Sequence, residues 1–232
     1  MRVRLGEVLL ATGFLGLMTT LYLAFNWAPS VDINAFKSPD AQRIFYWHVP
    51  AAWAAFIAFS VLFAGSALWF FKRSPLGWRM HIAGAEAGLA CGLIAVWSGC
   101  VWGAAEWGTP WDWQDYRLNT FGLLTLLALF LVLGRQSQPD GVETRDTFST
   151  FGLYGFVLVP ITYIATRIWV IRHPGPVIAG EEGSSISGDM AIVLTIGAIS
   201  FTLLIAGHII TSMNVTKLEQ RIDRLQTMLD GE

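Results

Sequence analysis

The stretch HIAGAEAGLACGLIAVWSGCVWG (residues 81–103) runs without a break into AAEWGTPWDWQDYRLNT (residues 104–120). The first part is apolar and long enough to cross a bilayer as a helix, which takes about 20 residues. The second part precedes another apolar run, so we expect a loop between two membrane spans. This loop gathers three tryptophans within seven residues, with acids and one arginine among them: Trp107, Trp111, Trp113, Glu106, Asp112, Asp115 and Arg117.

The composition is that of an integral membrane protein. Of the 232 residues, 54% are hydrophobic and 14% are charged, and the mean hydropathy is +0.51. Ordinary soluble domains carry about 25% charged residues. The formal net charge of -2 gives no indication of nucleic-acid binding. We expect the apolar run after MRVRLGEV to be a retained span, because no small-residue cleavage site follows it.

Two cysteines, Cys91 and Cys100, lie in one apolar run. In a helix, the rise of about 1.5 Å per residue would separate them by ~13 Å. A disulfide needs Cα atoms within about 7 Å of each other, so these residues are expected to be unpaired packing residues. The sequence has no C-x-x-C-H motif, which argues against a covalently attached c-type haem.

Six apolar segments predict an all-α membrane protein with six transmembrane helices and short connections. The segments are residues 6–27, 48–71, 81–103, 118–134, 148–171 and 189–212. We divide the chain into a transmembrane domain at 1–212, with an outer Trp-rich loop at 104–118, and a cytoplasmic amphipathic tail at 213–232. In the tail, apolar residues recur every three or four positions, which indicates a helix at the membrane interface or against a partner. They are Val215, Leu218, Ile222, Leu225, Met228 and Leu229.

Lysine and arginine predict the orientation, because they are enriched in cytoplasmic segments. With a cytoplasmic N-terminus, ten of the fifteen basic residues fall on the inner side. Both termini are therefore expected in the cytoplasm. The Trp-rich loop then lies on the outer side, which is the periplasm in a Gram-negative host.

The four histidines divide between the two surfaces. His48 enters the second span and His173 leaves the fifth, both on the outer side, whereas His81 and His208 are expected at the inner surface. Pro50 and Pro174 place the two outer histidines at helix ends, because proline does not continue a regular helix. We expect their side chains to project out of the bundle, forming an open site at the membrane surface.

Two outer imidazoles beside a platform of indoles suit a flat apolar ligand that carries a metal, and haem is the obvious candidate. Indole rings offer apolar area to a porphyrin, while Arg43 and Arg117 are available to pair with its propionates. A structural interpretation stays open, because tryptophan is enriched at membrane interfaces in any case. Glu86, near the inner end of the third span, is either a locally paired residue or a functional one.

QRIFYWHVPAAW (residues 42–53) and WGTPWDWQDYRLNT (residues 107–120) together resemble two signature stretches of a known family. The family is haem exporter protein C (CcmC), of cytochrome c maturation, and the second stretch is similar to its tryptophan-rich WWD segment. The six-span layout, the chain length and a histidine between spans 5 and 6 also match. The resemblance covers nearly the whole chain.

The resemblance implies a protein of the cell (inner) membrane that holds haem b, non-covalently and transiently, at the outer face. It implies transfer of the haem to a periplasmic haem chaperone, beside ABC transporter subunits and a small single-span accessory subunit. Such a protein binds and transfers haem and is not an enzyme in the strict sense. Carried over by position, His48 and His173 would be the axial ligands, and the platform would be Trp107, Gly108, Trp111, Trp113, Asp115 and Arg117, with Arg43 before the first histidine.

The chain departs from the family pattern in two places. Pro110 replaces the first tryptophan of the usual pair, and Gln114 stands where the acid is expected, with Asp115 one position later. Asp115 is taken as the equivalent acid, and Asp112 is the alternative. The second histidine lies in IWVIRHPGP (residues 168–176), which has one tryptophan where relatives often have more.

Three alternatives remain. A membrane electron-transfer subunit with a buried b-type haem would need histidine pairs within spans, and only His81 and His208 are available. A haem lyase-type cytochrome c synthetase component is usually longer, with more spans or a large outer domain. A transporter or channel would need intramembrane charges, for which Glu86 and Arg167 are the candidates.

Overall fold

The structure is a computed structural model that describes residues 2–31, 36–168 and 186–230. In these ranges six segments are long and apolar enough to cross a membrane, with α5 and α6 together forming one of them. The predicted all-α fold with six spans is therefore confirmed. The elements are α1 (Arg2–Asn26), the 3₁₀ helix η1 (Pro39–Ile44), α2 (Phe45–Lys72), α3 (Pro75–Trp107), α4 (Tyr116–Gln136), α5 (Val142–Gly155), α6 (Leu158–Ile168) and α7 (Gly188–Asp230).

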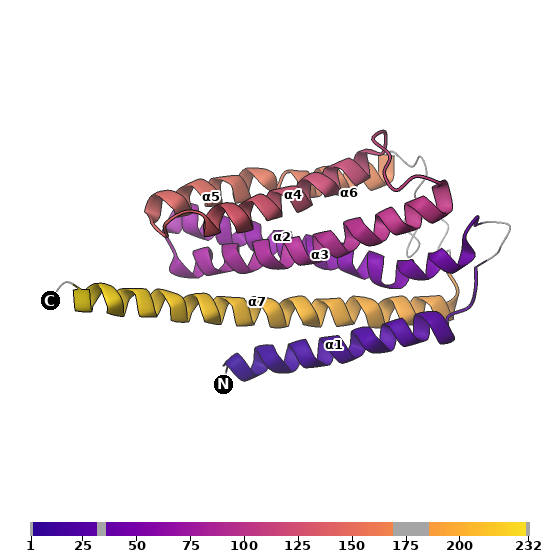
Figure 1. Ribbon diagram of the computed structural model, residues 1–232, viewed down its shortest axis with the longest axis horizontal. Coiled ribbons are helices and arrows are strands. Elements are labelled where there is room, and N and C mark those ends of the chain that lie inside the picture. The colour runs from indigo at the N-terminus through magenta and orange to yellow at the C-terminus, as the bar shows by residue number, and fades with distance from the viewer. Residues whose placement is uncertain (1, 32–35, 169–185, 231–232) are drawn as a thin grey trace.

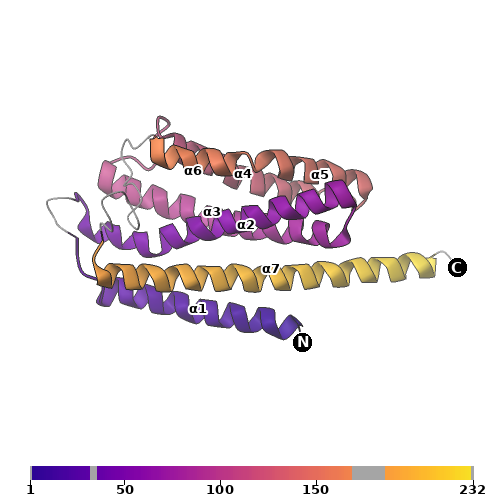
Figure 2. The same cartoon turned by 180° about the vertical axis from the view of Figure 1, so that it is seen from behind.

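The helices run side by side in one long bundle (Figure 1). α1 and α7 form an outer pair, α7 also packs on α2 and α3, and α4, α5 and α6 cover the far side (Figures 1 and 2). The α3–α4 connection lies at one end of the bundle, here called the Trp-loop end. Both chain ends lie towards the other end, here called the opposite end. Their orientation across the membrane remains a prediction.

α2 and α3 pack closely along their length because glycines face the partner backbone. A Cβ on Gly84 would lie 2.7 Å from Leu62 Cα, and one on Gly65 would lie 2.7 Å from the carbonyl oxygen of Gly77. Both distances are too short for a real side chain. In lipid there is no hydrophobic driving force for helices to associate. Close approach of the backbones at small residues provides stabilising van der Waals contacts instead.

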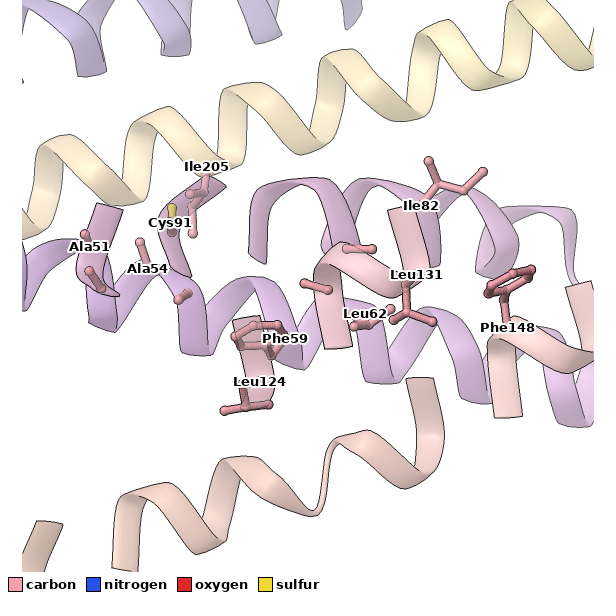
Figure 3. Close-up of a cluster of buried hydrophobic side chains, with 14 of the residues drawn as sticks. Ala51, Ala54, Phe59, Leu62, Ile82, Cys91, Leu124, Leu131, Phe148 and Ile205 are labelled. Carbon is pink, nitrogen blue, oxygen red and sulfur yellow. The ribbon is translucent and has the colours of Figure 1, made fainter. Parts of the chain in front are cut away.

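A core of buried apolar side chains joins α2, α3, α4 and α5, and α7 contributes Ile205 to it (Figure 3). Phe59 of α2 and Leu124 of α4 are among its larger members. Cys91 lies in this core, Cys100 is half-buried, and both thiols are free. The expectation that the cysteines are unpaired packing residues is confirmed.

The fifth span is interrupted, in contrast to the single helix predicted over 148–171. α5 ends at Gly155 and a short turn precedes α6. Pro160 accounts for the break, because proline has no N–H to donate to the carbonyl of Phe156 four residues earlier. The N–H of Val159 donates to that carbonyl instead, at 2.9 Å. The last three residues of the predicted span lie outside the described residues.

The sixth span and the tail, predicted as two units meeting between residues 212 and 213, form one continuous helix, α7. At about 1.5 Å per residue its 43 residues extend ~65 Å, twice the ~30 Å bilayer core. α7 therefore continues beyond the start of α1 at the opposite end (Figure 1). The helical periodicity predicted for the tail is confirmed, and its apolar side chains are exposed.

His81 lies near the start of α3, away from the Trp-rich loop as predicted, and its side chain is fully buried within the bundle. Its Nδ1 lies 2.9 Å from Ser66 Oγ and its ring stacks on Trp78, with centroids 4.8 Å apart. α5 covers the ring closely, because a Cβ on Gly152 would lie 3.2 Å from Nδ1. His208, in contrast, is 42% exposed at the opposite end, as predicted.

Glu86 is locally paired, which is one of the two interpretations that the sequence allows. One carboxylate oxygen lies 3.3 Å from Nη2 of Arg135, and the other accepts a hydrogen bond of 2.6 Å from the hydroxyl of Ser212. Nε2 of His208 lies 3.7 Å from the same carboxylate. Glu86 therefore connects α3, α4 and α7 near the opposite end of the bundle.

Candidate functional site

His48 lies in the first turn of α2 at the Trp-loop end, as predicted. Its ring does not project out of the bundle, which corrects the expectation drawn from Pro50. Nδ1 lies 3.0 Å from Ser98 Oγ on α3, and the side chain is half-buried. Gly99 leaves space for the ring, since a Cβ there would lie 3.1 Å from Cε1. The hydroxyl of Ser98 and the space left by Gly99, both on α3, thus direct the imidazole of His48 between α2 and α3.

The Trp-rich loop starts at the end of α3. Trp107 lies beside Trp102 of the same helix, with ring centroids 5.5 Å apart. Gly108 ends the helix with φ of +75°, a left-handed conformation that glycine adopts without steric cost. The chain then turns so that Trp111 and Trp113 meet edge to face, with centroids 5.9 Å apart. Of the three predicted platform tryptophans, Trp107 therefore pairs with Trp102, and Trp111 and Trp113 form a second pair.

Asn119, in the first turn of α4, organises the second pair and was not predicted as a site residue. Its Oδ1 accepts the indole N–H of Trp111 at 3.1 Å, and its Nδ2 donates to the carbonyl of Trp113 at 2.8 Å. The Trp113 side chain itself is 80% exposed. The loop thus presents a flat apolar ring to its surroundings while hydrogen bonds hold the backbone beneath it.

Asp115 and Arg117 have a different place from the surface platform that was predicted. Asp115 is the N-cap of α4 and accepts the backbone N–H groups of Arg117 and Leu118, at 3.0 and 3.4 Å. The guanidinium of Arg117 lies 3.2 Å from the Asp115 carboxylate, and both residues are buried. Arg117 is also close enough to His48 for an electrostatic interaction. The pair therefore supports the base of the loop, next to the histidine, rather than its surface.

Arg43 precedes His48 in η1, and its guanidinium binds the end of α1. Nη1 donates to the carbonyl of Ala24 and, at 3.3 Å, to that of Ala28. The last carbonyls of a helix have no partner within the helix, so this contact satisfies them. These contacts fix the segment that leads into α2, and the pairing of Arg43 with a haem propionate stays a prediction.

Glu106, for which the sequence indicated no particular role, connects the first loop to the Trp-rich loop. Its carboxylate accepts the backbone N–H groups of Lys37 and Ser38, at 3.0 and 2.8 Å. The hydroxyl of Ser38 returns a hydrogen bond to the carbonyl of Ala105, at 2.9 Å. These contacts join segments almost 70 residues apart in the sequence, which is why the sequence alone did not reveal them.

His173 lies outside the described residues, so its pairing with His48 stays a prediction. Within the described part of the chain, no group of three or more His, Cys, Asp or Glu side chains could hold a metal ion. Haem needs only one or two axial ligands from the protein, and the half-buried imidazole of His48 at the same end of the bundle as the Trp-rich loop fits this need.

Comparisons with known proteins agree with the geometry. A sequence model of the family described as Heme exporter protein C matches residues 1–228. A protein of that name from Bradyrhizobium diazoefficiens is 30% identical over 216 residues, which cover 93% of this chain and 82% of the relative. A protein of the same name from Paracoccus denitrificans is 26% identical, over 85% of this chain and 80% of the relative. One from Escherichia coli is 30% identical, over 65% of this chain and 60% of the relative. This chain belongs to the Heme exporter protein C family.

Proposed function

We propose that this protein binds haem at the Trp-loop end and passes it to a periplasmic haem chaperone during cytochrome c maturation. The cargo is haem b, held transiently and without a covalent bond, and the protein acts by binding and transfer rather than as an enzyme. Membership of the Heme exporter protein C family supports this function. The observation that carries it is the placement of His48 beside α3, at the end of the bundle where α3 leads into the Trp-rich loop.

His48 and His173 are the proposed axial ligands of the haem iron, each through one ring nitrogen. The Trp-rich loop is the platform, and its exposed ring, Trp113, is the surface available to the porphyrin. Asp115 and Arg117 act from beneath, because their buried ion pair fixes the start of α4 against the loop. Iron bound at this site would supply the coordination position for which the chaperone competes.

The proposed partners are ABC transporter subunits and a small single-span accessory subunit in the inner membrane. The word exporter in the names of the relatives supports an association with transport machinery. The positions of the basic residues support a haem site on the periplasmic face. We propose that one ligand, His173, binds weakly and is exchanged when the chaperone arrives. Unchanged haem retention and unchanged chaperone loading in His173→Ala would contradict this exchange.

The function is tested by the optical spectrum and haem content of the purified protein, expressed with and without its partner subunits. His48→Ala and His173→Ala are compared with the wild type, and His208→Ala is the matched control, since it removes a half-buried histidine at the opposite end. Loss or spectral change of haem in the first two variants alone is the expected result. Haem that persists in His48→Ala and disappears in His208→Ala would instead indicate an electron-transfer haem at the opposite end.

A further inference from the structure

Ser98, the residue of α3 that contacts His48, has only one hydrogen to donate. It is 1% exposed, and its hydroxyl lies 2.6 Å from the carbonyl of Ile94 and 3.2 Å from that of Ala95. A carbonyl oxygen can only accept, so the hydroxyl hydrogen points to the α3 backbone. The oxygen of Ser98 therefore presents a lone pair to Nδ1 of His48, 3.0 Å away.

A lone pair facing Nδ1 determines which ring nitrogen of His48 carries the hydrogen. Two acceptors facing each other make no hydrogen bond, so Nδ1 must be the protonated nitrogen. In the neutral ring the in-plane lone pair is then on Nε2, which becomes the nitrogen able to ligate a metal.

We propose that Ser98 is a positioning residue that holds His48 in the Nδ1–H tautomer and so assigns Nε2 to the haem iron. The proposal rests on the proposed function. Gly99 sets the position of the ring from the next residue of α3, because a Cβ there would lie 3.1 Å from Cε1 and 3.7 Å from Nδ1. Tautomer and position of the ligand are therefore set by two adjacent residues on a rigid helix.

The protein contains the same pair a second time, without access to a ligand. Ser66 donates to the carbonyl of Leu62 at 2.8 Å, and its Oγ lies 2.9 Å from Nδ1 of His81. Both Ser66 and His81 are 0% exposed and lie away from the Trp-loop end. Ser66→Ala is thus a matched control, since it removes an equivalent serine–histidine hydrogen bond from the packed bundle. Ser98→Thr keeps the hydroxyl and tests rescue.

Partners that orient a metal-ligating histidine typically change metal affinity 10–100-fold when they are mutated. We therefore expect Ser98→Ala to weaken haem binding at least about tenfold. The midpoint potential of the haem iron in Ser98→Ala should rise, because an imidazole that has lost its hydrogen-bond acceptor donates less electron density to the iron. Gly99→Ala should weaken binding by displacing the ring while leaving the tautomer unchanged. Ser98→Thr should behave as the wild type, and Ser66→Ala should change neither affinity nor potential.

The experiment uses the full chain in nanodiscs, titrated with hemin, with optical and resonance Raman spectra and the iron midpoint potential. A second measurement needs no haem: nitrogen-15 NMR of histidine-labelled protein reads the tautomer of His48, assigned by its absence in His48→Ala. The Nδ1–H form in the wild type, and a shift towards the other tautomer in Ser98→Ala, are expected. A wild-type tautomer in Ser98→Ala, or the Nε2–H form in the wild type, would overturn the proposal.

The two proposals fail in different ways. If His48→Ala binds hemin as tightly as the wild type, the ligand role of His48 is wrong, and with it the assignment of iron to Nε2. If His48→Ala loses haem but Ser98→Ala keeps wild-type affinity and potential, the proposed function stands and the positioning role of Ser98 is wrong. Equal effects of Ser66→Ala and Ser98→Ala on haem would also overturn it, because they would show a general packing defect.

Discussion

Glu106 at the end of α3 accepts the backbone N–H of Ser38 at 2.8 Å, which fixes the first loop against the start of the Trp-rich loop. The same carboxylate accepts the N–H of Lys37 at 3.0 Å. Because η1 and α2 follow within a few residues of Ser38, the contact also limits where His48 can stand relative to the tryptophans. Hydrogen bonds to a charged group contribute about 1.5–3 kcal/mol each, less where water reaches them.

We expect Glu106→Ala to lower haem retention several-fold while reducing the free energy of unfolding by only about 1–2 kcal/mol, because the contact orders two surface loops. Haem content and thermal denaturation of the detergent-solubilised protein are the measurements. Glu143→Ala, which removes an exposed acid in the first turn of α5, is the control and should change neither. Wild-type haem content in Glu106→Ala would show that the placement of the loops does not matter for binding.

The two candidate acids of the WWD segment are predicted to behave differently. Asp115→Ala removes the N-cap of α4, which contributes about 1 kcal/mol, and leaves the buried Arg117 without its counter-ion. Breaking a buried ion pair costs about 3–5 kcal/mol. Asp112→Ala should cost less than Asp115→Ala, because the hydrogen bond that the Asp112 carboxylate accepts from the N–H of Gln114 is exposed to water.

The free energy of unfolding of both variants is the measurement. Asp115→Ala combined with Arg117→Met should recover part of the loss, because the double variant no longer buries an unpaired charge. Equal destabilisation by Asp112→Ala and Asp115→Ala would contradict the assignment of Asp115 as the structural acid.

The spans could be predicted from the sequence because hydropathy depends on local composition, and the apolar run 81–103 lies within α3 as expected. The direction of individual side chains could not be predicted from the sequence, because it depends on contacts between distant segments. His48 faces α3 only because Ser98 and Gly99 lie opposite it, and Arg43 binds the end of α1 rather than facing outwards. Pro160 was visible in the sequence and signals the break of the fifth span, but hydropathy alone does not register it.

Gly84→Ala should separate α2 from α3. The new Cβ would lie 2.7 Å from Leu62 Cα, which is backbone and cannot move aside as a flexible side chain can. Overpacking of this kind typically costs about 1–3 kcal/mol, and we expect the upper part of that range. The measurement is reversible unfolding in mixed micelles. Gly188→Ala is the control, because nothing lies within 4 Å of its Cβ position. Equal stability of the two variants would mean that α2 and α3 do not depend on close backbone contact.

Glu86→Gln tests at which end of the bundle haem binds. The change removes the charge that holds Arg135, with Ser212 and His208 beside it, and should lower the free energy of unfolding by about 1.5–3 kcal/mol. Along α3, Glu86 lies twelve residues before Ser98, or ~18 Å at about 1.5 Å per residue. The spectrum and midpoint potential of bound haem should therefore stay as in the wild type, while stability falls. A shift of the potential or a loss of haem in Glu86→Gln, restored by adding Arg135→Gln, would place the haem beside this junction. The proposed ligand His48 would then have to be abandoned in favour of His208.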